Sequence, residues 1–317
     1  MSIDSCPVRE SIREINDKSW VIGGRILLSR QSLPPSSGTF WGDGTGSFYT
    51  ITDAPHPPSE YLPLPATSHP FEKVYDVGDA HATWIIGEAA LKVQLVPKEI
   101  PSVTREHVTI NEVKKRSFSF AIPEVYHHAE FEGRYYIFLS KIHGETLSQA
   151  WPKMGETAKQ NCVARVVSII KELMVWRGPN ISGVDGGYLP DRYLARRGPR
   201  EEKDWSPSEL LRCCQELGMD CSTFVFHHLD LGPGNIFVND TFEINAIIDW
   251  ECAGFIPIDW IRTKFTMCPG LDLDDFDWEY LDKRVEYRWR VATELANEGF
   301  DQVTKKWFSW AGIPMNN

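Results

Sequence analysis

The chain has 317 residues, enough for one large or two medium units with a sizeable core, and 42% of them are apolar. Its formal net charge of −11 argues against a nucleic-acid partner, because phosphate backbones attract Lys and Arg. The sequence contains no run of eighteen apolar residues, so we expect no membrane span. The N-terminus lacks the basic start and apolar stretch of a secretory signal, and seven cysteines without a Cys-x2-Cys pair indicate neither a disulfide framework nor a zinc site, so we expect a cytoplasmic location.

Residues 1–70 are the first of three predicted regions, an N-terminal extension that is partly irregular. A helix is expected over residues 11–28, although Gly23 and Gly24 interrupt it. Residues 31–70 are rich in Pro, Gly, Ser and Thr, which predicts a long loop or a partly ordered arm. A fully disordered tail would have fewer aromatic residues, so we expect parts of this arm to dock on the body of the protein. These aromatics are Phe40, Trp41, Phe48, Tyr49 and Tyr61.

Residues 71–142 are the second region, a smaller lobe rich in strands. Short β-prone runs are separated by turn signals at Gly78-Asp79 and at Gly87-Glu88. A helix is expected to open after Pro101-Ser102. The expected elements are strands over residues 73–77, 81–86, 89–95 and 135–139, and a helix over residues 103–115.

Residues 143–317 are the third region, a larger and mostly helical lobe. Apolar residues recur at helical spacing between residues 163 and 174, which predicts a buried scaffold helix, and a second helix is expected over residues 281–297. Residues 183–187, Gly-Val-Asp-Gly-Gly, predict a glycine-rich turn near the junction of the lobes. No Lys-Ser/Thr pair follows this turn, so it does not match a phosphate-binding loop.

The most informative segment is residues 226–238, Phe-His-His-Leu-Asp-Leu-Gly-Pro-Gly-Asn-Ile-Phe-Val, followed by Ile-Ile-Asp-Trp-Glu at residues 247–251. An Asn-Asp turn between two short apolar runs predicts a hairpin. Asn235 should therefore enter one strand, and Asp249 should leave the other strand at the same end of the hairpin. The spacing brings three oxygen-bearing side chains together, since Asp230 precedes Asn235 by a short loop.

These residue types suit phosphoryl transfer, which needs a carboxylate near the attacking hydroxyl and oxygen ligands that hold Mg²⁺ on the phosphates. Asp230 is the candidate for the first role. Asn235 and Asp249 are the candidates for the second, because Mg²⁺ prefers oxygen donors and keeps several waters. The alternative role for Asp230 is that of a carboxylate that only orients the hydroxyl and balances charge, since a loose transition state needs little early proton removal.

At these residues the chain resembles the aminoglycoside phosphotransferase and choline kinase family, which is related to the protein kinases. Asp-Leu-x-Pro-x-Asn followed by Ile-Asp-Trp-Glu is closer to that family than to protein kinases, which carry Asp-Phe-Gly at the last position. Further segments resemble a fungal branch of the family: His-Gly-Glu-Thr-Leu at residues 143–147, Trp-Pro at 151–152, the turn at 183–187 and Gly-Phe-Ile-Pro at 254–257. The resemblance covers about residues 72–265. It implies an α+β, two-lobed protein kinase-like fold, with a small β-rich N-lobe and a larger helical C-lobe, that uses ATP and Mg²⁺ to phosphorylate a hydroxyl of a small molecule.

The resemblance also implies the nucleotide-binding residues. Lys92, on the third predicted strand, would hold the phosphates, although an ordinary exposed strand lysine is the alternative. Glu106 would pair with Lys92, and Glu112 is its rival on the same helix. Gly78 belongs to the turn that would cover the phosphates, where the usual glycine triplet is reduced to a single glycine. The backbone around Ser140 and Ile142 would bind adenine between the lobes.

Two neighbours of Asp230 have alternative roles. His228 could be a base, but a packed, hydrogen-bonded histidine that braces the loop is favoured, because kinase-like sites use the nearby Asp. Leu229 stands where the family usually has glycine. We expect a leucine to be tolerated there if its side chain points into the core.

The sequence does not determine the substrate. An acidic cluster after Pro269-Gly270 is interleaved with aromatics and could bind a cation, but a solvated loop with tryptophans in the core is favoured. The residues concerned are Asp272, Asp274, Asp275, Asp277 and Glu279, with Trp250, Trp260, Trp278 and Tyr280. The acidic net charge is compatible with a cationic or a neutral substrate. Oligomeric state and the choice of ATP or GTP stay open.

The alternative function is a catalytically silent nucleotide-binding pseudokinase or scaffold protein on the same fold. The single-glycine turn favours it, whereas the complete set of Lys92, Asp230, Asn235 and Asp249 argues against it. A protein kinase is disfavoured, because no Ala-Pro-Glu segment follows Asp249.

Overall fold

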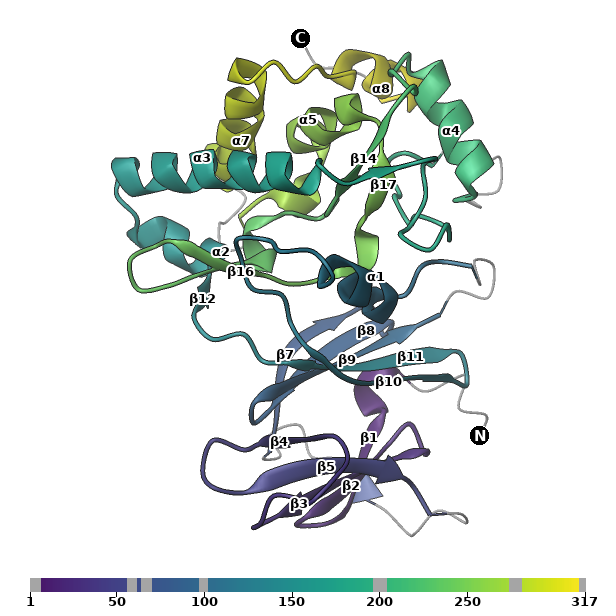
Figure 1. The fold of residues 1–317 in the computed structure, drawn as a ribbon, viewed down its shortest axis with the longest axis vertical. Coiled ribbons are helices and arrows are strands. Elements are labelled where there is room, and N and C mark those ends of the chain that lie inside the picture. The colour runs from purple at the N-terminus through teal and green to yellow at the C-terminus, as the bar shows by residue number, and fades with distance from the viewer. Residues whose placement is uncertain are drawn as a thin grey trace. The chain divides into compact units, whose positions relative to one another are not determined.

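A computed structural model describes residues 7–55, 62–63, 70–96, 102–195, 204–273 and 281–313. By their internal contacts the residues divide into two compact units. The first unit is Met1–Pro101 with Pro123–Lys141, and the second is Ser102–Ile122 with Ile142–Asn317. Strands dominate the first unit, and the second contains all the α-helices that the structure describes (Figure 1). The predicted α+β class, with a strand-rich and a helical part, is confirmed.

The N-terminal extension forms an antiparallel sheet with strand order β4-β5-β3-β2-β1-β6. The helix expected over residues 11–28 is wrong. Gly23 and Gly24 adopt positive φ of 59° and 78° and turn the chain between two paired strands, in which Ile22 faces Ile26. The expected long loop is also largely replaced by this sheet. Its strands are β1 (Ile12–Asn16), β2 (Ser19–Ile22), β3 (Ile26–Gln31), β4 (Phe40–Gly42), β5 (Phe48–Asp53) and β6 (Leu62–Pro63).

A second sheet of the first unit has the order β10-β11-β9-β8-β7 and is antiparallel throughout. The strands predicted in this region are confirmed. The turn between the first two contains Gly78 and Asp79, both with φ near +60°. The strands are β7 (Phe71–Val77), β8 (His81–Ile86), β9 (Ala89–Leu95), β10 (Val125–Phe131) and β11 (Arg134–Ser140).

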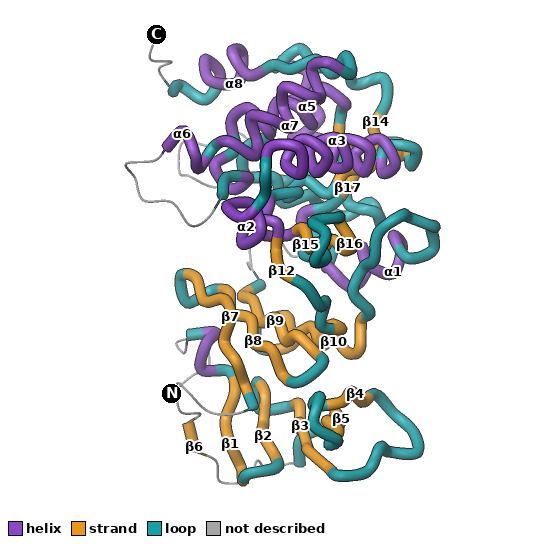
Figure 2. The backbone as a smooth tube through the Cα atoms, turned by 90° about the vertical axis from the view of Figure 1, so that its left-hand side faces the viewer, coloured by secondary structure: helices purple, strands orange, loops and turns teal. Residues whose placement is uncertain are grey.

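The two sheets of the first unit share one apolar core and lie one against the other (Figure 2). Side chains alternate between the faces of a strand, so register decides which face is covered. Trp84 pairs with Leu91 across β8 and β9, and both belong to this core. Lys92 pairs with Thr83 and Ile137 and lies on the opposite face. The N-terminal sheet therefore covers the face of the second sheet that does not carry Lys92.

Two of the aromatics expected to dock the N-terminal arm do so. Trp41 and Tyr49 are buried in the shared core, and the Trp41 indole N–H donates a hydrogen bond to the Ile86 carbonyl at 2.7 Å. Phe40 remains 39% exposed, and Tyr61 lies outside the described residues. Burial of large aromatic surfaces stabilises such a contact at roughly 25 cal/mol per Å² of apolar area.

The second unit is built around α7, on which α3 and α5 both pack (Figure 1). The scaffold helix predicted near residues 163–174 is confirmed as part of α3. Instead of one helix over residues 281–297, two consecutive helices flank Val285. The helices are α1 (Glu106–Val113), α2 (Leu147–Ala150), α3 (Glu156–Leu173), α4 (Pro207–Glu216), α5 (Ile258–Met267), α6 (Leu281–Arg284), α7 (Glu286–Asn297) and α8 (Thr304–Trp310).

Short strands complete the second unit in two three-stranded sheets, with orders β12-β15-β16 and β13-β14-β17. They are β12 (Glu145–Thr146), β13 (Arg177–Gly178), β14 (Phe224–His227), β15 (Ile236–Val238), β16 (Ile244–Ile247) and β17 (Gly254–Ile256). Among the described residues, no helix has both the length and the apolar character that a membrane crossing requires. No disulfide joins the cysteines of the described segments.

Candidate functional site

The predicted hairpin of the second unit is present and brings two candidate residues to one end. Strands β15 and β16 pair with Ile236 opposite Ile247. The Ile248 N–H then donates to the Asn235 carbonyl at 3.0 Å, which extends the pairing by one step. Asp249 follows immediately, so Asn235 and Asp249 lie at the same end of the hairpin. Both side chains are half-buried.

Asn235 holds Asp230 directly. Its side-chain Nδ2 donates to the Asp230 carbonyl at 2.8 Å and to the Asp230 Oδ2 at 3.0 Å. Because the amide nitrogen of Asn235 faces Asp230, the Oδ1 atom of Asn235 points away from Asp230, where it can act as a metal ligand. A carboxylate fixed in this way is oriented before any ligand arrives.

His228 braces the loop, as favoured from the sequence. It is fully buried, its Nδ1 accepts a hydrogen bond from the Asp230 N–H at 3.3 Å, and its Nε2 lies 2.9 Å from the Ile248 carbonyl. Since Nδ1 accepts, the proton sits on Nε2, which donates to Ile248. One imidazole thus connects the segment of Asp230 to the segment of Asp249, and neither ring nitrogen is left for use as a base.

Leu229 and His227 complete this loop from within the core. Leu229 has φ +65°, a region that favours glycine, and its side chain is buried, as expected. The Leu229 N–H donates to the His227 Nδ1 at 2.9 Å, whereas the His227 Nε2 finds no hydrogen-bond partner among the described residues. Burial, reinforced by His228 and Lys264, lowers the pKa of His227 to about 3, so this ring is neutral at physiological pH.

The Asp249 carboxylate lies close to two others, those of Glu106 and Glu251. Oxygen atoms of Glu106, Asp249 and Glu251 lie within 4.8 Å of one another, and the Glu106 Oε1 accepts a hydrogen bond from the Trp250 N–H at 3.1 Å. Asp249 has a left-handed backbone with φ +66° and ψ +61°. Such strain in a non-glycine residue costs about 1–3 kcal/mol and is concentrated at functional sites. A set of hard oxygen donors with like charges fits a divalent cation such as Mg²⁺.

Glu106 and its rival Glu112 have different environments. Glu106 is buried beside Trp250, whereas Glu112 forms an ion pair with Lys115 on the outer face of α1. Only Glu106 therefore faces the segment of Asp249.

The remaining candidates lie in the first unit or at its end. Lys92 is half-buried in the middle strand of its sheet, and Gly78 is exposed in the β7–β8 turn. Asp79 in that turn forms an ion pair with Arg9 of the N-terminal extension. The Ser140 N–H donates to the Glu124 carbonyl at 2.8 Å. The chain passes from the first unit to the second between Lys141 and Ile142.

Comparison with protein families decides the classification. The profile of the phosphotransferase enzyme family matches residues 70–260, which is more than half of the chain and includes the whole hairpin region. The chain belongs to this family. The resemblance seen in the sequence motifs is thus confirmed at the level of the family.

Solved structures of aminoglycoside phosphotransferases are similar at low identity. APH(3'')-Id from Streptomyces rimosus has 15% identity and a TM-score of 0.45, over 78% of this chain and 87% of that one. A thermostable mutant of APH(4)-Ia with AMP-PNP and hygromycin B has 15% identity and a TM-score of 0.48, over 77% and 84%. APH(2'')-IIa with streptomycin and ATP has 18% identity and a TM-score of 0.46, over 75% and 80%. A search of the curated proteins finds no significant match.

Contacts far along the chain stabilise the second unit, and one of them reaches the loop of Asp230. The Tyr287 hydroxyl of α7 is buried and donates to the Leu231 carbonyl at 3.0 Å. Lys264 of α5 forms a buried ion pair with Asp191 at 3.0 Å. Burial alone would raise the pKa of Asp191, but Lys264 and the Trp260 N–H outweigh it and hold this pKa below its ordinary value. No sequence motif marked these residues, because their partners lie more than fifty positions away along the chain.

The alternative of a cation-binding pocket receives no support from the described part of the acidic cluster. Asp272 is buried and forms ion pairs with Arg284 and Arg288, so its charge is already compensated. Trp250 and Trp260 are both 0% exposed and belong to the core, which confirms the favoured alternative for these two residues. The other members of the cluster, Asp274, Asp275, Asp277, Trp278, Glu279 and Tyr280, lie outside the described residues.

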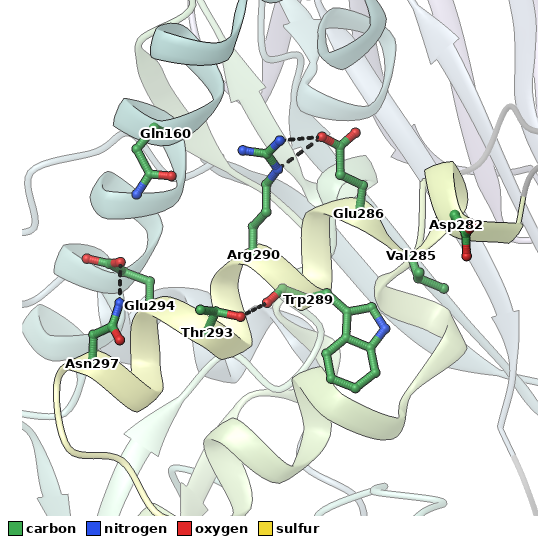
Figure 3. Close-up of a pocket in the computed structure, with 9 residues that line it drawn as sticks. All are labelled: Gln160, Asp282, Val285, Glu286, Trp289, Arg290, Thr293, Glu294 and Asn297. Carbon is green, nitrogen blue, oxygen red and sulfur yellow. Dashed lines mark hydrogen bonds and ion pairs between the residues drawn. The ribbon is translucent and has the colours of Figure 1, made fainter. Parts of the chain in front are cut away.

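An open pocket of about 460 Å³ lies along α7 (Figure 3), and none of these candidates lines it. It is lined by one face of that helix, by Asp282 and by Gln160 of α3. Its carboxylate Glu286 is already engaged by Arg290 and Lys159. The pocket contains none of the converging oxygen donors, so we locate the candidate site at the hairpin instead.

Proposed function

We propose that this phosphotransferase transfers the terminal phosphoryl group of ATP to a hydroxyl group of a small molecule. One observation supports the proposal: Asp230, Asn235 and Asp249 lie at the same end of the hairpin. Two hydrogen bonds from Asn235 orient Asp230, and the Ile248 N–H bond to Asn235 brings Asp249 alongside. This is the arrangement that phosphoryl transfer needs from its protein, which is mainly positioning and charge.

Asp230 accepts a hydrogen bond from the attacking hydroxyl and takes up its proton as the new P–O bond forms and the bond to the leaving ADP breaks. Its orientation is set by Asn235, so the carboxylate does not have to be ordered in the transition state. A positioned base of this kind contributes roughly 10²–10⁴-fold to the rate.

The oxygen atoms of Asn235 and Asp249 would hold Mg²⁺. When bound, Mg²⁺ supplies positive charge that neutralises the phosphate oxygens. Lys92 would hold the phosphates and be oriented by Glu106, and the turn of Gly78 would cover them. The backbone at Ser140 and Ile142 would contact adenine. The half-burial of Lys92 supports its role, since an ordinary strand lysine is exposed.

The acceptor is proposed as a small hydroxyl compound without a required positive charge. Among the described members of the cluster, Asp272 is compensated by Arg284 and Arg288, and Trp250 and Trp260 are buried, so these residues give no support for an ammonium-binding pocket. A cytoplasmic location stays a prediction from the cysteine pattern.

The test is a panel of amino alcohols, aminoglycosides and sugars, incubated with MgATP and either the wild-type protein or Asp230→Asn. We expect MgATP to raise the Tm of both proteins, because a ligand that binds only the native state stabilises it. We expect turnover by the wild type alone.

Turnover that persists in Asp230→Asn would refute the assigned mechanism. A Tm shift without turnover across the panel would favour the silent nucleotide-binding alternative. Absence of any shift with MgATP, at concentrations that saturate related kinases, would refute nucleotide use altogether.

A further inference from the structure

The glycine-rich turn at residues 183–187 has no role in the proposed mechanism, yet it forms several hydrogen bonds within the second unit. The Gly183 N–H donates to the Gly187 carbonyl at 2.9 Å, and the Gly186 N–H donates to the Gly183 carbonyl at 3.1 Å. Gly186 has φ +81°. These bonds fix the shape of the turn without outside help, so its contacts can position another segment.

One side of the turn contacts the segment that leads into α1. The Thr104 hydroxyl donates to the Asp185 Oδ1, which also accepts the Gly187 N–H at 2.9 Å. The Tyr188 N–H donates to the Ser102 carbonyl at 2.7 Å. Thr104 is buried and stands two residues before Glu106. The turn therefore holds the start of the helix that carries Glu106.

The closeness of this contact explains two of the glycines. A Cβ at position 183 would lie 1.9 Å from the Thr104 Oγ1, and a Cβ at position 187 would lie 2.6 Å from the same atom. No other residue could occupy either position without moving Thr104. The absence of a side chain at Gly183 and Gly187 thus leaves room for the Thr104 side chain.

The other side of the turn contacts the chain just after Asp249. The Phe255 N–H donates to the Ser182 carbonyl at 2.8 Å, and Ser182 pairs with Phe255 in an antiparallel bridge. Phe255 lies in β17, a few residues beyond Trp250, whose N–H donates to Glu106. The contacts form a closed ring, from Trp250 to Glu106, through Thr104 to the turn, and back through β17.

We propose that Asp185, acting through Thr104, is a positioning residue that fixes the Glu106 carboxylate beside Asp249. The purpose of this contact, which is to hold Glu106 where it can orient Lys92, rests on the proposed function. Oxygen atoms of Glu106, Asp249 and Glu251 lie within 4.8 Å of one another, so a small displacement of α1 would change the position of Glu106 relative to Asp249. A fixed helix start limits that displacement before ligands bind.

The test removes one hydroxyl and compares it with a matched control. Thr104→Val deletes the donor to Asp185 and keeps the side-chain volume, whereas Thr104→Ser retains the donor. Thr109→Val is the control, because Thr109 is buried on α1, the helix that carries Glu106, and its hydroxyl has no hydrogen-bond partner among the described residues. Asp185→Ala removes the same contact from its exposed side if Thr104→Val fails to fold.

The first measurement is hydrogen exchange of the Trp250 amide without nucleotide. We expect about fivefold faster exchange in Thr104→Val and Asp185→Ala, the effect of losing one buried hydrogen bond, and wild-type exchange in Thr104→Ser and Thr109→Val. Equal Trp250 exchange in Thr104→Val and Thr109→Val would overturn the proposal, even if both variants lose stability.

The second measurement is kcat/KM for ATP well below the Tm, which we expect to fall about fivefold in Thr104→Val and to recover in Thr104→Ser. Unchanged kcat/KM alongside faster Trp250 exchange would refute the purpose assigned to the contact. A wild-type protein that binds no MgATP would instead refute the proposed function, and the exchange of Trp250 would still decide whether Asp185 positions Glu106.

Discussion

The N-terminal sheet and the β15–β16 hairpin are both antiparallel, yet different forces hold them. Strands β1–β5 attach to the second sheet of their unit through a core of apolar and aromatic side chains. The hairpin end is held by single polar atoms, among them the Asn235 Nδ2 and the His228 Nε2. Apolar contacts are many and individually small, whereas each polar contact at the hairpin fixes one functional group. Substitutions in the core of the N-terminal sheet should therefore lower the free energy of unfolding, and substitutions of the polar groups at the hairpin end should lower the turnover rate.

Trp84→Ala should give the largest loss of stability. Trp84 is buried in the core shared by the two sheets, on the face opposite Lys92. Large-to-small changes of this kind cost about 3–5 kcal/mol. We expect a corresponding fall in the free energy of unfolding in urea, with kcat unchanged for the fraction that stays folded. A fall in kcat without a change in stability would break the distinction between the two regions.

Asn235→Ala should have the opposite signature. It removes both hydrogen bonds to Asp230 and one proposed oxygen ligand, so we expect turnover to fall about 10²–10³-fold, comparable to losing a positioned donor in other active sites. The free energy of unfolding should change by about 1 kcal/mol, because the side chain is only half-buried.

Asn235→Asp separates the two roles of this side chain. It keeps an oxygen ligand but replaces the donor to Asp230 with a like charge. If metal binding alone mattered, this variant would retain turnover and its dependence on Mg²⁺. We expect it to lose turnover almost as fully as Asn235→Ala, and titration with MgCl₂ in the presence of ATP provides the measurement.

The same contrast explains what the sequence could predict. The hairpin, its turn and the convergence of Asn235 with Asp249 follow from residues less than twenty positions apart. The brace from His228 was also predictable, because it lies beside Asp230. Short-range spacing of this kind leaves few alternative folds.

The N-terminal sheet was misread because its decisive information is long-range. Residues 11–28 contain enough apolar positions for a helix, and only burial of Trp20 and Ile22 against the second sheet selects strands. From the sequence Gly23 and Gly24 indicate an interrupted helix, whereas in the structure their positive φ forms the turn of a hairpin. Tyr287 and the Asp191–Lys264 pair were missed for the same reason, since their partners lie more than fifty residues away.

His227→Asn tests whether the burial of His227 makes the stability of the protein depend on pH. The pKa of His227 is lowered to about 3 in the folded protein from an ordinary value of 6.5, chiefly by burial. Between these values the unfolded chain binds a proton that the folded protein does not, so stability falls as pH decreases from 6.5 towards 3. The contribution is at most about 1.4 kcal/mol per pH unit.

Asn at position 227 can still accept the Leu229 N–H but does not titrate. We therefore expect a shallower loss of stability between pH 6.5 and pH 4 in urea unfolding, with nearly wild-type stability at pH 7. An identical pH dependence in the two proteins would show that His227 becomes protonated in the folded state and that its burial is not maintained.

Leu229 gives the smallest and most specific test, because one residue there combines both kinds of interaction. Its buried side chain stabilises the core, while its φ of +65° is unfavourable for any residue except glycine by about 1–2 kcal/mol. Leu231 is equally buried two residues later and is not among the residues with positive φ. Both Leu→Ala variants should lose stability through the cavity they create.

The comparison of alanine with glycine then isolates the backbone. At position 229 glycine should be more stable than alanine by about 1 kcal/mol, because it relieves the left-handed strain. At position 231 the order should reverse, because glycine there only adds flexibility to the unfolded chain. Urea unfolding of the four variants measures both differences. The same order at the two positions would mean that Leu229 does not hold the left-handed conformation, and that the orientation of Asp230 is set by Asn235 and His228 alone.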